Sequence, residues 1–383
     1  MASLKPLFIV PDLAGGGAER MTLTLIADLR RRGYDPILFM LRERGALLAE
    51  VPDGITVVAG VNGGANLHRS AIPIFLRLLR CARSADVIVG AMELEPTYFA
   101  FLCAKLLGKP AVGWVHIAME QYLPRFSHWH RRLTEWIYPR LDRVVFCSKG
   151  AAASLDRVVR LRADRTTTIL NFIDLESIRA KAREALPVWG RKAFAKPTLL
   201  ASGRLTSQKG FDVLIRAHAR SRASGIDSNL IILGEGPLRE ELQKLAASLD
   251  VAASVFMPGF ELNPYPAMKS ASVFVLSSRL EGFSVVLLEA LALGIPIVAT
   301  DCPSGPAELL EGGRNGLLVP PDNEAALADA IATLLRDRQL CDSLKRAGLA
   351  HANEFTAEYA MPRWERLLSE VTDVRRKGAS RDL

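Results

Sequence analysis

The segment 277–301, SSRLEGFSVVLLEALALGIPIVATD, places two carboxylates around the start of a predicted helix. Glu281 lies in a glycine-containing loop, Ser284 is a suitable N-cap, and the apolar run that follows ends at Gly294. Glu289 falls inside that run, where a carboxylate is costly unless it is hydrogen-bonded. Each acid alone also fits an ordinary role, exposed in a loop or bonded to a structural partner. Together they favour a helix N-terminus that binds an anion, flanked by carboxylates that accept hydrogen bonds from sugar hydroxyls.

A second group of candidate ligands is cationic. In SGRLTSQKGFDVLIRAHA, Arg204 and Lys209 flank a short loop that contains Gly203 and Gly210 and joins a predicted strand to a predicted helix. Both cations can converge there on a pair of phosphates. Solvated surface charges are the usual interpretation of such a pair, but the strand–glycine–helix setting favours the phosphate site.

A glycine turn follows the first predicted strand, in PDLAGGGAERMTLTLIADLRRRG. Gly16 and Gly17 let the main chain approach an anion closely, and the helix that follows offers free N–H groups. The dinucleotide fingerprint G-x-G-x-x-G is incomplete, because Arg20 stands where its third glycine should be. A plain tight turn explains the motif equally well.

Strand-like apolar runs that alternate with longer amphipathic segments must position these loops. This alternation is typical of a parallel sheet covered by helices. It stops at 168–174, and the charged, proline-containing stretch 176–197 is the predicted linker. It then restarts, so we expect two doubly wound α/β domains that bind ligands at the carboxyl ends of their strands, across a deep cleft. The predicted strands are 7–10, 36–41, 86–90, 111–115, 143–148, 198–203, 229–234, 253–257, 272–278 and 295–300.

Length and composition narrow the class of protein. The chain has 383 residues, enough for two domains, and its 49% hydrophobic and 23% charged residues exclude disorder, collagen and coiled coil. The first apolar run, LFIV, is shorter than a secretory signal, and no apolar window is long enough to span a membrane, so we expect a cytoplasmic protein. The five cysteines are widely separated, without a C-x-x-C pair, so metal and redox chemistry are not expected.

The motifs together point to one family. EGFSVVLLE, with Glu281 and Glu289 at its ends, is similar to the signature of the retaining glycosyltransferases of family 4, which have the GT-B fold. The GGGAER turn, the GRLTSQKG loop, LGEGP and the closing RNGLLVPPDNEAALADAI resemble the same family in the same order, over almost the whole chain. The resemblance implies an acceptor-side Rossmann-like domain at 1–178 and a donor-binding one at 190–357. A C-terminal helix, 358–383, is expected to pack back on the first domain, with a kink at Pro362.

The resemblance also implies which residues hold the donor diphosphate. Arg204 and Lys209 match a cationic pair on the two phosphates. Gly16 and Gly17 match a first-domain loop that closes over them. Three main-chain groups match a cradle at the helix N-terminus: those of Phe283, Ser284 and Val285.

Other matches concern the sugar, the ribose and the base. Glu281 matches the acid that contacts the transferred sugar, and Glu289 the acid that holds the ribose. His116, in AVGWVHIAMEQY, matches a catalytic histidine beside the transferred sugar, although a lone histidine after a strand is more often structural. Phe260, in PGF, matches the loop that reads the nucleobase.

Two features of the sequence bear on the donor and on metals. Ser284 stands where many relatives carry glycine or proline, and DCPSGPAELL (301–310) resembles the branch that makes capsular, exopolysaccharide and lipid-linked glycans. Donors with uridine diphosphate, carrying galactose or an N-acetylhexosamine, are common in that branch. The sequence contains no D-x-D triplet, so the resemblance implies a transferase that needs neither a metal nor another cofactor.

The basic residues are concentrated in the first half of the chain. Residues 1–178 hold 23 basic and 17 acidic side chains, net +6, whereas the remainder is net +2. The segments 68–84 and 124–143 interleave arginines with large apolar and aromatic residues, which is typical of helices that lie on an anionic leaflet. A core-packed helix with a solvated face is the alternative for each. Nucleic acid is disfavoured, because the charges follow no groove-binding motif. In 124–143 the arginines are Arg125, Arg131, Arg132, Arg140 and Arg143.

The leading hypothesis is therefore a retaining glycosyltransferase that moves a hexose or N-acetylhexosamine from a nucleotide diphosphate donor, with uridine favoured, to a lipid-linked or nascent glycan. It is expected to act peripherally, on the inner face of the cytoplasmic membrane. A nucleotide-sugar 2-epimerase has a similar architecture and needs no acceptor. A catalytically silent nucleotide-sugar-binding subunit is the third possibility.

Overall fold

The computed structural model describes residues 3–67 and 69–379. The chain forms two compact units. Unit 1 contains Met1–Phe172 and Ala357–Leu383, and unit 2 contains Ile173–Thr356. The positions His68 and 380–383, which belong to the segments 68–84 and 358–383 discussed above, lie outside the described residues.

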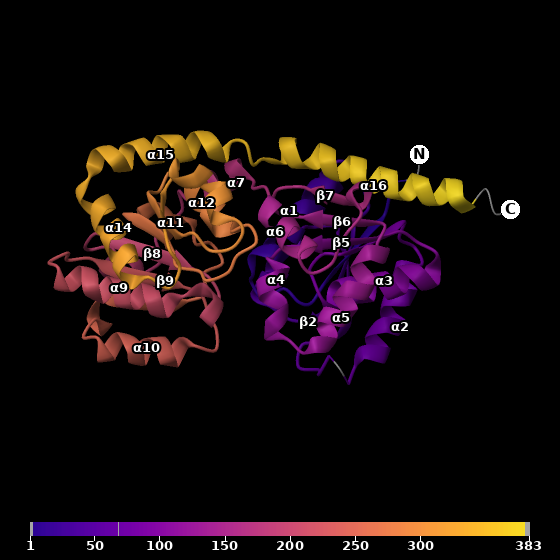
Figure 1. The fold of residues 1–383 in the computed structure, drawn as a ribbon, viewed down its shortest axis with the longest axis horizontal. Helices are drawn as coiled ribbons and strands as arrows, with labels where there is room; N and C mark the ends of the chain where they lie inside the picture. The colour runs from indigo at the N-terminus through magenta and orange to yellow at the C-terminus, as the bar shows by residue number, and fades with distance from the viewer. Residues whose placement is uncertain (1–2, 68, 380–383) are drawn as a thin grey trace. The chain divides into compact units, whose positions relative to one another are not determined.

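Unit 1 is built on a parallel sheet with helices on its faces (Figure 1). Within the described residues the sheet has seven strands in the order β3-β2-β1-β4-β5-β6-β7. The strands are β1 Pro6–Val10, β2 Ile37–Glu43, β3 Thr56–Asn62, β4 Val87–Gly90, β5 Ala111–Val115, β6 Arg143–Phe146 and β7 Thr166–Thr168. The helices are α1 Gly17–Arg31, α2 Ala71–Ala82, α3 Glu95–Leu107, α4 Met119–Tyr122, α5 His128–Ile137, α6 Lys149–Asp156 and α16 Ala357–Ala379. Short 3₁₀ turns are η1 Ala46–Glu50, η2 Leu123–Arg125, η3 Tyr138–Arg140 and η4 Ala163–Arg165.

Unit 2 repeats the design with a parallel sheet of six strands among the described residues, in the order β10-β9-β8-β11-β12-β13. The strands are β8 Thr198–Ser202, β9 Asn229–Leu233, β10 Val255–Gly259, β11 Val273–Leu276, β12 Ile297–Thr300 and β13 Leu317–Val319. The helices are α7 Leu175–Lys181, α8 Gly190–Ala193, α9 Phe211–Ala223, α10 Arg239–Ser248, α11 Tyr265–Ser270, α12 Val285–Ala292, α13 Pro306–Leu309, α14 Glu324–Arg336 and α15 Arg338–Ala352. The 3₁₀ turns are η5 Ser207–Lys209, η6 Ala252–Ser254 and η7 Glu311–Gly313.

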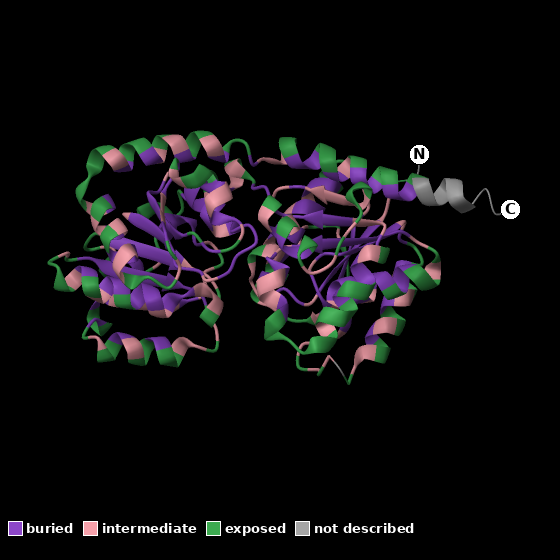
Figure 2. Ribbon diagram, viewed as in Figure 1, coloured by how far each residue is buried: buried purple, intermediate pink, exposed green. Residues whose placement is uncertain are grey.

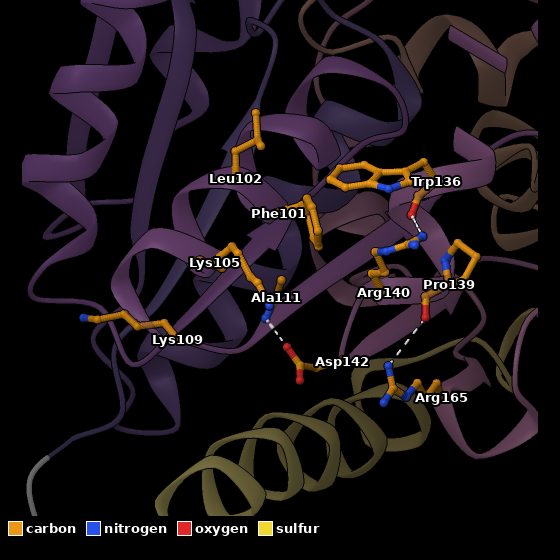
Figure 3. Close-up of a pocket in the computed structure, with 11 residues that line it drawn as sticks. Phe101, Leu102, Lys105, Lys109, Ala111, Trp136, Pro139, Arg140, Asp142 and Arg165 are labelled. Carbon is orange, nitrogen blue, oxygen red and sulfur yellow. Dashed lines mark hydrogen bonds between the residues drawn. The ribbon is translucent and has the colours of Figure 1, made fainter. Parts of the chain in front are cut away.

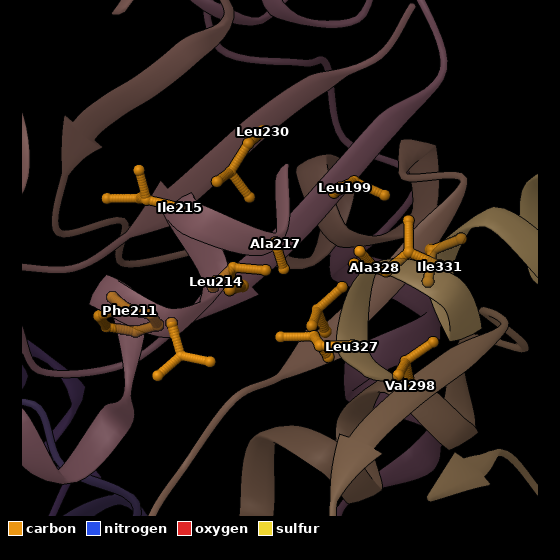
Figure 4. Close-up of a cluster of buried hydrophobic side chains, with 14 of the residues drawn as sticks. Leu199, Phe211, Leu214, Ile215, Ala217, Leu230, Val298, Leu327, Ala328 and Ile331 are labelled. Carbon is orange, nitrogen blue, oxygen red and sulfur yellow. The ribbon is translucent and has the colours of Figure 1, made fainter. Parts of the chain in front are cut away.

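Uninterrupted apolar runs make the central strands, because both faces of these sheets are covered (Figure 2). All five residues of β1, β5 and β9 are buried. In unit 2 one such face supports a cluster in which Leu214 of α9 and Leu327 and Ile331 of α14 pack over Leu199 of β8 (Figure 4). The prediction of two doubly wound α/β units is confirmed.

Strand order reverses at one point in each sheet, between β1 and β4 in unit 1 and between β8 and β11 in unit 2. At such a switch point the loops at the carboxyl ends of neighbouring strands leave in opposite directions and open a crevice for ligands. The loops after β1, β8 and β11 contain Gly16, Arg204 and Glu281 respectively. The fold therefore positions these candidate residues where doubly wound sheets bind ligands.

The predicted linker 176–197 proves to be part of unit 2. It contains α7 and α8, and the boundary between the units falls after Phe172 rather than at 178. The reason is that the Ile173 N–H donates to the Phe355 oxygen (2.9 Å) and Ile178 of α7 is buried. The stretch 176–197 was predicted to be a linker because it is charged, contains proline and has no strand-like apolar run.

The C-terminal helix α16 belongs to unit 1. Its Trp364 is fully buried and meets Trp114 of β5 edge to face, with ring centroids 4.7 Å apart. Glu365 and Glu370 pair with Arg32 (3.5 Å) and Arg143 (3.4 Å). The helix is continuous from Ala357 to Ala379, and the kink predicted at its internal proline does not divide it. None of the helices among the described residues has the length and apolar character needed to cross a bilayer.

Candidate active site

The loop after β8 and the loop after β11 are joined by hydrogen bonds in unit 2. The Ser277 hydroxyl donates to the Lys209 main-chain oxygen (2.9 Å), and the Gln208 side-chain amide donates to the Leu280 oxygen (2.9 Å). The Arg279 N–H donates to the Gln208 oxygen (2.8 Å). Residues 72 positions apart in the chain are thereby held in a fixed relation, which places Lys209 beside the loop that contains Glu281.

Gly210 allows the two loops to meet so closely. Its φ is +62°, in the left-handed region, and a Cβ at this position would lie 2.0 Å from the Ser277 oxygen. Any other residue would push the end of η5, and with it Lys209, away from the β11 loop. This glycine therefore serves the close approach of two backbones as well as a turn.

Arg279 adds a polar clamp to the same junction. Its guanidinium donates to both carboxylate oxygens of Asp212 in α9 (2.9 and 2.7 Å) and to the main-chain oxygen of Ser207 in η5 (2.7 Å). Burial would raise the pKa of Asp212, but the hydrogen bonds and charge of Arg279 outweigh it and leave that pKa lowered. A two-pronged ion pair of this kind fixes orientation as well as distance.

A short ion pair joins the two charged residues at the centre of this junction. Lys209 Nζ lies 2.6 Å from Glu281 Oε1, and the Ser278 hydroxyl donates to the same oxygen, also at 2.6 Å. The Glu281 residue is only 6% exposed. A carboxylate so buried needs a partner, and the lysine supplies it. An ammonium has three donors, so Lys209 can bind a further anion while it holds Glu281.

Arg204 lies on the same loop but is exposed. In the described part of the chain its guanidinium makes no hydrogen bond or ion pair, so all of its donors remain available to a ligand. The structure thus brings Lys209 and Glu281 into contact and leaves Arg204, which is on the same loop as Lys209, as an unengaged cation in the described part of the chain.

Ser284 was predicted to be the N-cap of α12, and the structure places it at that position. Ser284 occupies the N-cap position with extended backbone, but its side chain makes no capping hydrogen bond. Its hydroxyl oxygen is buried and has no hydrogen-bond partner among the residues that the structure describes. The first N–H groups of an uncapped helix are left to bind an anion, together with the hydroxyl.

The neighbours of Ser284 are fixed by packing. Phe283 is buried against Phe355, with ring centroids 5.6 Å apart, and Val285 is buried at the first position of α12. The Ser304 hydroxyl donates to the Gly282 oxygen (2.7 Å) and ties the loop after β12 to the same turn. The segment after α15 and the loop after β12 therefore support the helix N-terminus.

Glu289 is buried within α12, as its apolar surroundings predict, and its Oε1 accepts a hydrogen bond from the Tyr265 hydroxyl (2.9 Å). Tyr265 was not among the predicted site residues, and only its position in a proline-flanked loop, NPYPAM, could have drawn attention to it. Phe260, predicted beside the nucleobase, directly follows β10 and is half-buried. The roles of Glu289 and Phe260 toward a nucleoside stay predictions.

In unit 1, Gly16 and Gly17 mark the start of α1, Gly16 as N-cap and Gly17 as the first helical residue. The Glu19 carboxylate occupies the adjacent space, because a Cβ on Gly16 would lie 2.2 Å from it. The loop is anchored by Asp12, whose carboxylate binds Arg42 of β2 (3.1 Å) and Arg44, which directly follows β2 (2.7 Å). A side chain at position 16 would therefore have to displace the Glu19 carboxylate.

His116 follows β5, and both its ring nitrogens are buried. Burial lowers its pKa to about 3, and the main chain of Ala91 opposes the shift only in part. The imidazole is therefore neutral near pH 7 and lies against Trp114, with ring centroids 4.2 Å apart.

Glu93 is a candidate that sequence analysis did not identify. Its carboxylate Oε2 accepts the main-chain N–H of His116 (3.1 Å) across the ends of β4 and β5. Burial raises the pKa of this carboxyl, although two main-chain hydrogen bonds oppose the shift. Glu93 follows a strand that was predicted from the sequence, but its neighbours in the sequence do not distinguish it from an exposed acidic residue of a loop.

Comparison with known proteins places the chain in a family. Residues 15–177 match the family model described as Glycosyltransferase Family 4, and residues 190–351 match Glycosyl transferases group 1. A Campylobacter jejuni protein named N-acetylgalactosamine-N,N'-diacetylbacillosaminyl-diphospho-undecaprenol 4-alpha-N-acetylgalactosaminyltransferase is 36% identical over 90% of this chain and 93% of its own. The chain belongs to glycosyltransferase family 4.

Further similarities agree with this assignment. The lipopolysaccharide core biosynthesis glycosyltransferase LpsE of Rhizobium meliloti is 28% identical over 87% of this chain and 89% of its own. Among solved structures, Anabaena HepE in complex with UDP and glucose superposes with a TM-score of 0.81 at 22% identity, covering 96% of this chain and all of the other. The last similarity confirms the GT-B type of fold. The protein is a glycosyltransferase.

Proposed function

We propose that this glycosyltransferase moves a hexose or N-acetylhexosamine from a UDP-sugar to a lipid-linked glycan, with retention at the anomeric carbon and without a metal. The observation that supports this most directly is the Lys209–Glu281 pair beside the uncapped N-terminus of α12. A cation and free helix N–H groups suit a leaving diphosphate, and an adjacent carboxylate suits a sugar hydroxyl.

The residues divide the work of the reaction. Charge that develops on the leaving diphosphate is neutralised by Arg204, Lys209 and the amides at Ser284, which supply the charge stabilisation that a metal ion provides in metal-dependent enzymes. Among the described residues, no group of three or more His, Cys, Asp or Glu side chains is arranged to hold a metal ion. His116 is neutral, so its proposed contribution is a hydrogen bond to the transferred sugar rather than a positive charge.

The acceptor proposal rests on the most informative relative. The Campylobacter protein is named for transfer of N-acetylgalactosamine to a diphospho-undecaprenol-linked sugar, and it is similar along 93% of its own length. We therefore infer a polyprenyl diphosphate-linked glycan as acceptor and an N-acetylhexosamine as the first sugar to test. UDP is the first nucleotide to test because HepE was solved with UDP and glucose.

An acceptor with a polyprenyl chain lies in a membrane, so the enzyme must reach one. The sequence assigned to unit 1 contains 29 Lys and Arg against 20 Asp and Glu, net +9, whereas unit 2 contains 20 against 21, net −1. We propose that unit 1 docks peripherally on the anionic inner face of the cytoplasmic membrane. Nucleic acid has no part in the proposal.

A donor and acceptor screen tests the reaction. UDP- and GDP-sugars are incubated with and without polyprenyl diphosphate-linked acceptors, nucleotide release is measured, and the anomeric configuration of the product is read by NMR. Acceptor-dependent UDP release, an α-linked product from an α-donor and unchanged rates in EDTA support the proposal. An altered sugar formed from the donor alone would indicate an epimerase, and nucleotide-sugar binding without turnover across the panel would indicate a silent binding subunit.

A further inference from the structure

A cavity of about 390 Å³ opens on unit 1 at the amino ends of β5 and β6 (Figure 3). Ala111, the first residue of β5, and Asp142, which precedes β6, form one wall. His116 follows the other end of β5, so the length of a five-residue strand separates it from the cavity, roughly 15 Å. The cavity is therefore distinct from the candidate active site of this unit.

One side of the cavity is aromatic. Phe101 of α3 and Trp136 of α5 meet edge to face, with ring centroids 5.4 Å apart. The Arg140 guanidinium lies over the Trp136 ring, 5.0 Å from its centroid, and donates to the Trp136 oxygen (2.6 Å). A guanidinium has five N–H donors, so this bond leaves Arg140 with donors for an anion.

The charged groups around the cavity favour an anionic ligand. Besides Arg140, the lining includes Arg165, which donates to the oxygens of Pro139 and Leu141, and Lys105, which is exposed. Within the described residues Lys105 has no hydrogen bond or ion pair.

Two further charged side chains alter this balance little. The Lys109 ammonium is engaged by main-chain oxygens at the end of α2, including that of Ala82 (2.8 Å), so only its stem faces the cavity. Among the described residues that line the cavity, Asp142 has the one carboxylate, and it accepts a hydrogen bond from the Ala111 N–H (2.9 Å). Arg140 and Lys105, together with Arg165, which already donates to two main-chain oxygens, therefore face one carboxylate.

The helices around the cavity expose large apolar side chains to solvent. Trp129 is 59% exposed, Trp136 48% and Leu106 67%. α2 and α3 lie side by side, with Phe75 and Phe99 rings in contact at 6.1 Å, and their exposed apolar residues extend the same kind of surface. Arginines beside exposed tryptophans are typical of surfaces that enter a lipid headgroup layer. The exposed apolar residues of this surface are Ile72, Leu76, Leu102, Leu106, Trp129, Leu133 and Trp136.

We propose that this cavity binds the phosphate headgroup of one anionic phospholipid of the membrane while the surrounding apolar residues enter the leaflet. The inference rests on the proposed membrane docking of unit 1 and adds a specific site to it. Cations in the cavity recognise the phosphate, and the Phe101–Trp136 side accommodates the start of an acyl chain. An overall positive surface would bind anionic vesicles but would not need any particular arginine.

The test compares two pairs of substitutions that remove the same charge. The pair Lys105→Gln/Arg140→Gln alters the cavity, and the pair Arg80→Gln/Arg83→Gln alters exposed arginines of α2 and its end, outside the lining. Arg165 is left intact because its guanidinium bonds two main-chain oxygens. Equal melting temperatures of the two variants and the wild type establish that each is folded.

Calorimetry with dihexanoyl phosphatidylglycerol, a monomeric short-chain lipid, gives the decisive comparison. We expect wild-type binding, at least tenfold weaker binding in the cavity pair, less than twofold change in the α2 pair, and no binding of dihexanoyl phosphatidylcholine. If both double variants bind the phosphatidylglycerol equally more weakly than the wild type, the overall positive charge of unit 1 explains the binding and the proposal is overturned. Binding of inorganic phosphate as tight as that of the lipid would overturn it in favour of a free-phosphate site.

Sedimentation of the wild type with phosphatidylglycerol vesicles separates this inference from the docking on which it rests. If the protein sediments but the cavity pair behaves like the α2 pair, membrane docking stands and the headgroup site falls. If the wild type does not sediment, the docking proposal itself fails. Neither result bears on turnover of the sugar donor, which is measured with a detergent-solubilised acceptor.

Discussion

Lys209 is proposed to interact with two groups. It already neutralises Glu281 in the absence of donor, and it is expected to bind the donor diphosphate as well. Removing the ammonium leaves a carboxylate that is 6% exposed and hydrogen-bonded only to the Ser278 hydroxyl among the described residues, next to the proposed diphosphate site. Lys209→Ala should therefore lower kcat/KM by about 2–4 kcal/mol of transition-state stabilisation, more than Arg204→Ala, whose charge is exposed.

A double variant isolates the electrostatic repulsion between the Glu281 carboxylate and the donor diphosphate. In Lys209→Ala/Glu281→Gln the buried charge is gone, so UDP affinity measured by calorimetry should partly recover relative to Lys209→Ala, although turnover should not. If the double variant binds UDP no better than the single one, the carboxylate is not close enough to the diphosphate for the proposed geometry.

The two acids of α12 and its loop should separate sugar chemistry from nucleotide binding. Glu281→Gln should reduce turnover more than UDP affinity, because Glu281 is assigned to the sugar. Glu289→Gln should weaken UDP binding, because it is assigned to the ribose, and Tyr265→Phe controls for loss of the hydrogen bond that Glu289 already accepts. If Glu281→Gln instead weakens UDP binding and Glu289→Gln instead reduces turnover, the roles assigned to the two acids must be exchanged.

His116 should add an acid-sensitive component to the stability of unit 1. Its pKa is lowered to about 3 from 6.5, so between these values the unfolded chain binds a proton that the folded unit excludes. Stability should therefore fall as pH decreases from about 6.5 toward 3. The loss of stability between pH 7 and pH 5, followed by urea unfolding, should be smaller in His116→Asn. Equal slopes in the variant and the wild type would show that the imidazole is accessible to protons.

At the scale of elements, Gly210 tests whether the β8 and β11 loops must meet for function. Gly210→Ala combines strain at φ +62° with a Cβ placed 2.0 Å from the Ser277 oxygen. Gly225→Ala is the matched control, since its φ is +86° but a Cβ there meets nothing within 4 Å. Both should lose about 1–2 kcal/mol of stability from strain, and only Gly210→Ala should also lose donor turnover, measured as UDP release. Equal activity in the two variants would mean that the loop junction is not required.

The sequence predicted the inner strands well because burial on both faces leaves an unmistakable apolar run. It missed β3, β7 and β13, and all three lie at sheet edges. Part of β3 is exposed, and β7 is the polar triplet TTT, so neither presents a buried run. Edge strands depend on the neighbour that they pair with, and that neighbour is not visible locally.

The sequence predicted which residues form the site, but it did not predict the contacts between them. Spacing and resemblance identified Arg204, Lys209, Glu281 and Glu289, but the pairing of Lys209 with Glu281 depends on loop hydrogen bonds over 72 residues. Burial of Glu93 beside the end of β5 likewise follows from strand order. Such contacts are properties of the folded sheet and have no local signal.

At the scale of the whole molecule, the fold concentrates positive charge more than the linear sequence suggests. The segment 1–178 is net +6, but unit 1 gains α16 and loses the acidic start of α7, which brings it to net +9. The segment 124–143 is not one helix, since it divides into η2, α5, η3 and the start of β6. Arg143 begins β6 and pairs with Glu370, so it does not belong to the exposed basic surface predicted for it.

The last prediction concerns the remaining four arginines, Arg125, Arg131, Arg132 and Arg140, which are all exposed. Each contributes on the order of 1 kcal/mol near an anionic leaflet, so together they can hold unit 1 reversibly without a lipid anchor. Replacing all four by glutamine should abolish sedimentation with phosphatidylglycerol vesicles and leave the melting temperature unchanged, because surface charges add little to stability. High salt should have the same effect on the wild type. Sedimentation that persists in the variant and in high salt, or equal binding to phosphatidylcholine vesicles, would show that these arginines are only solvated and that the acceptor is reached by another route.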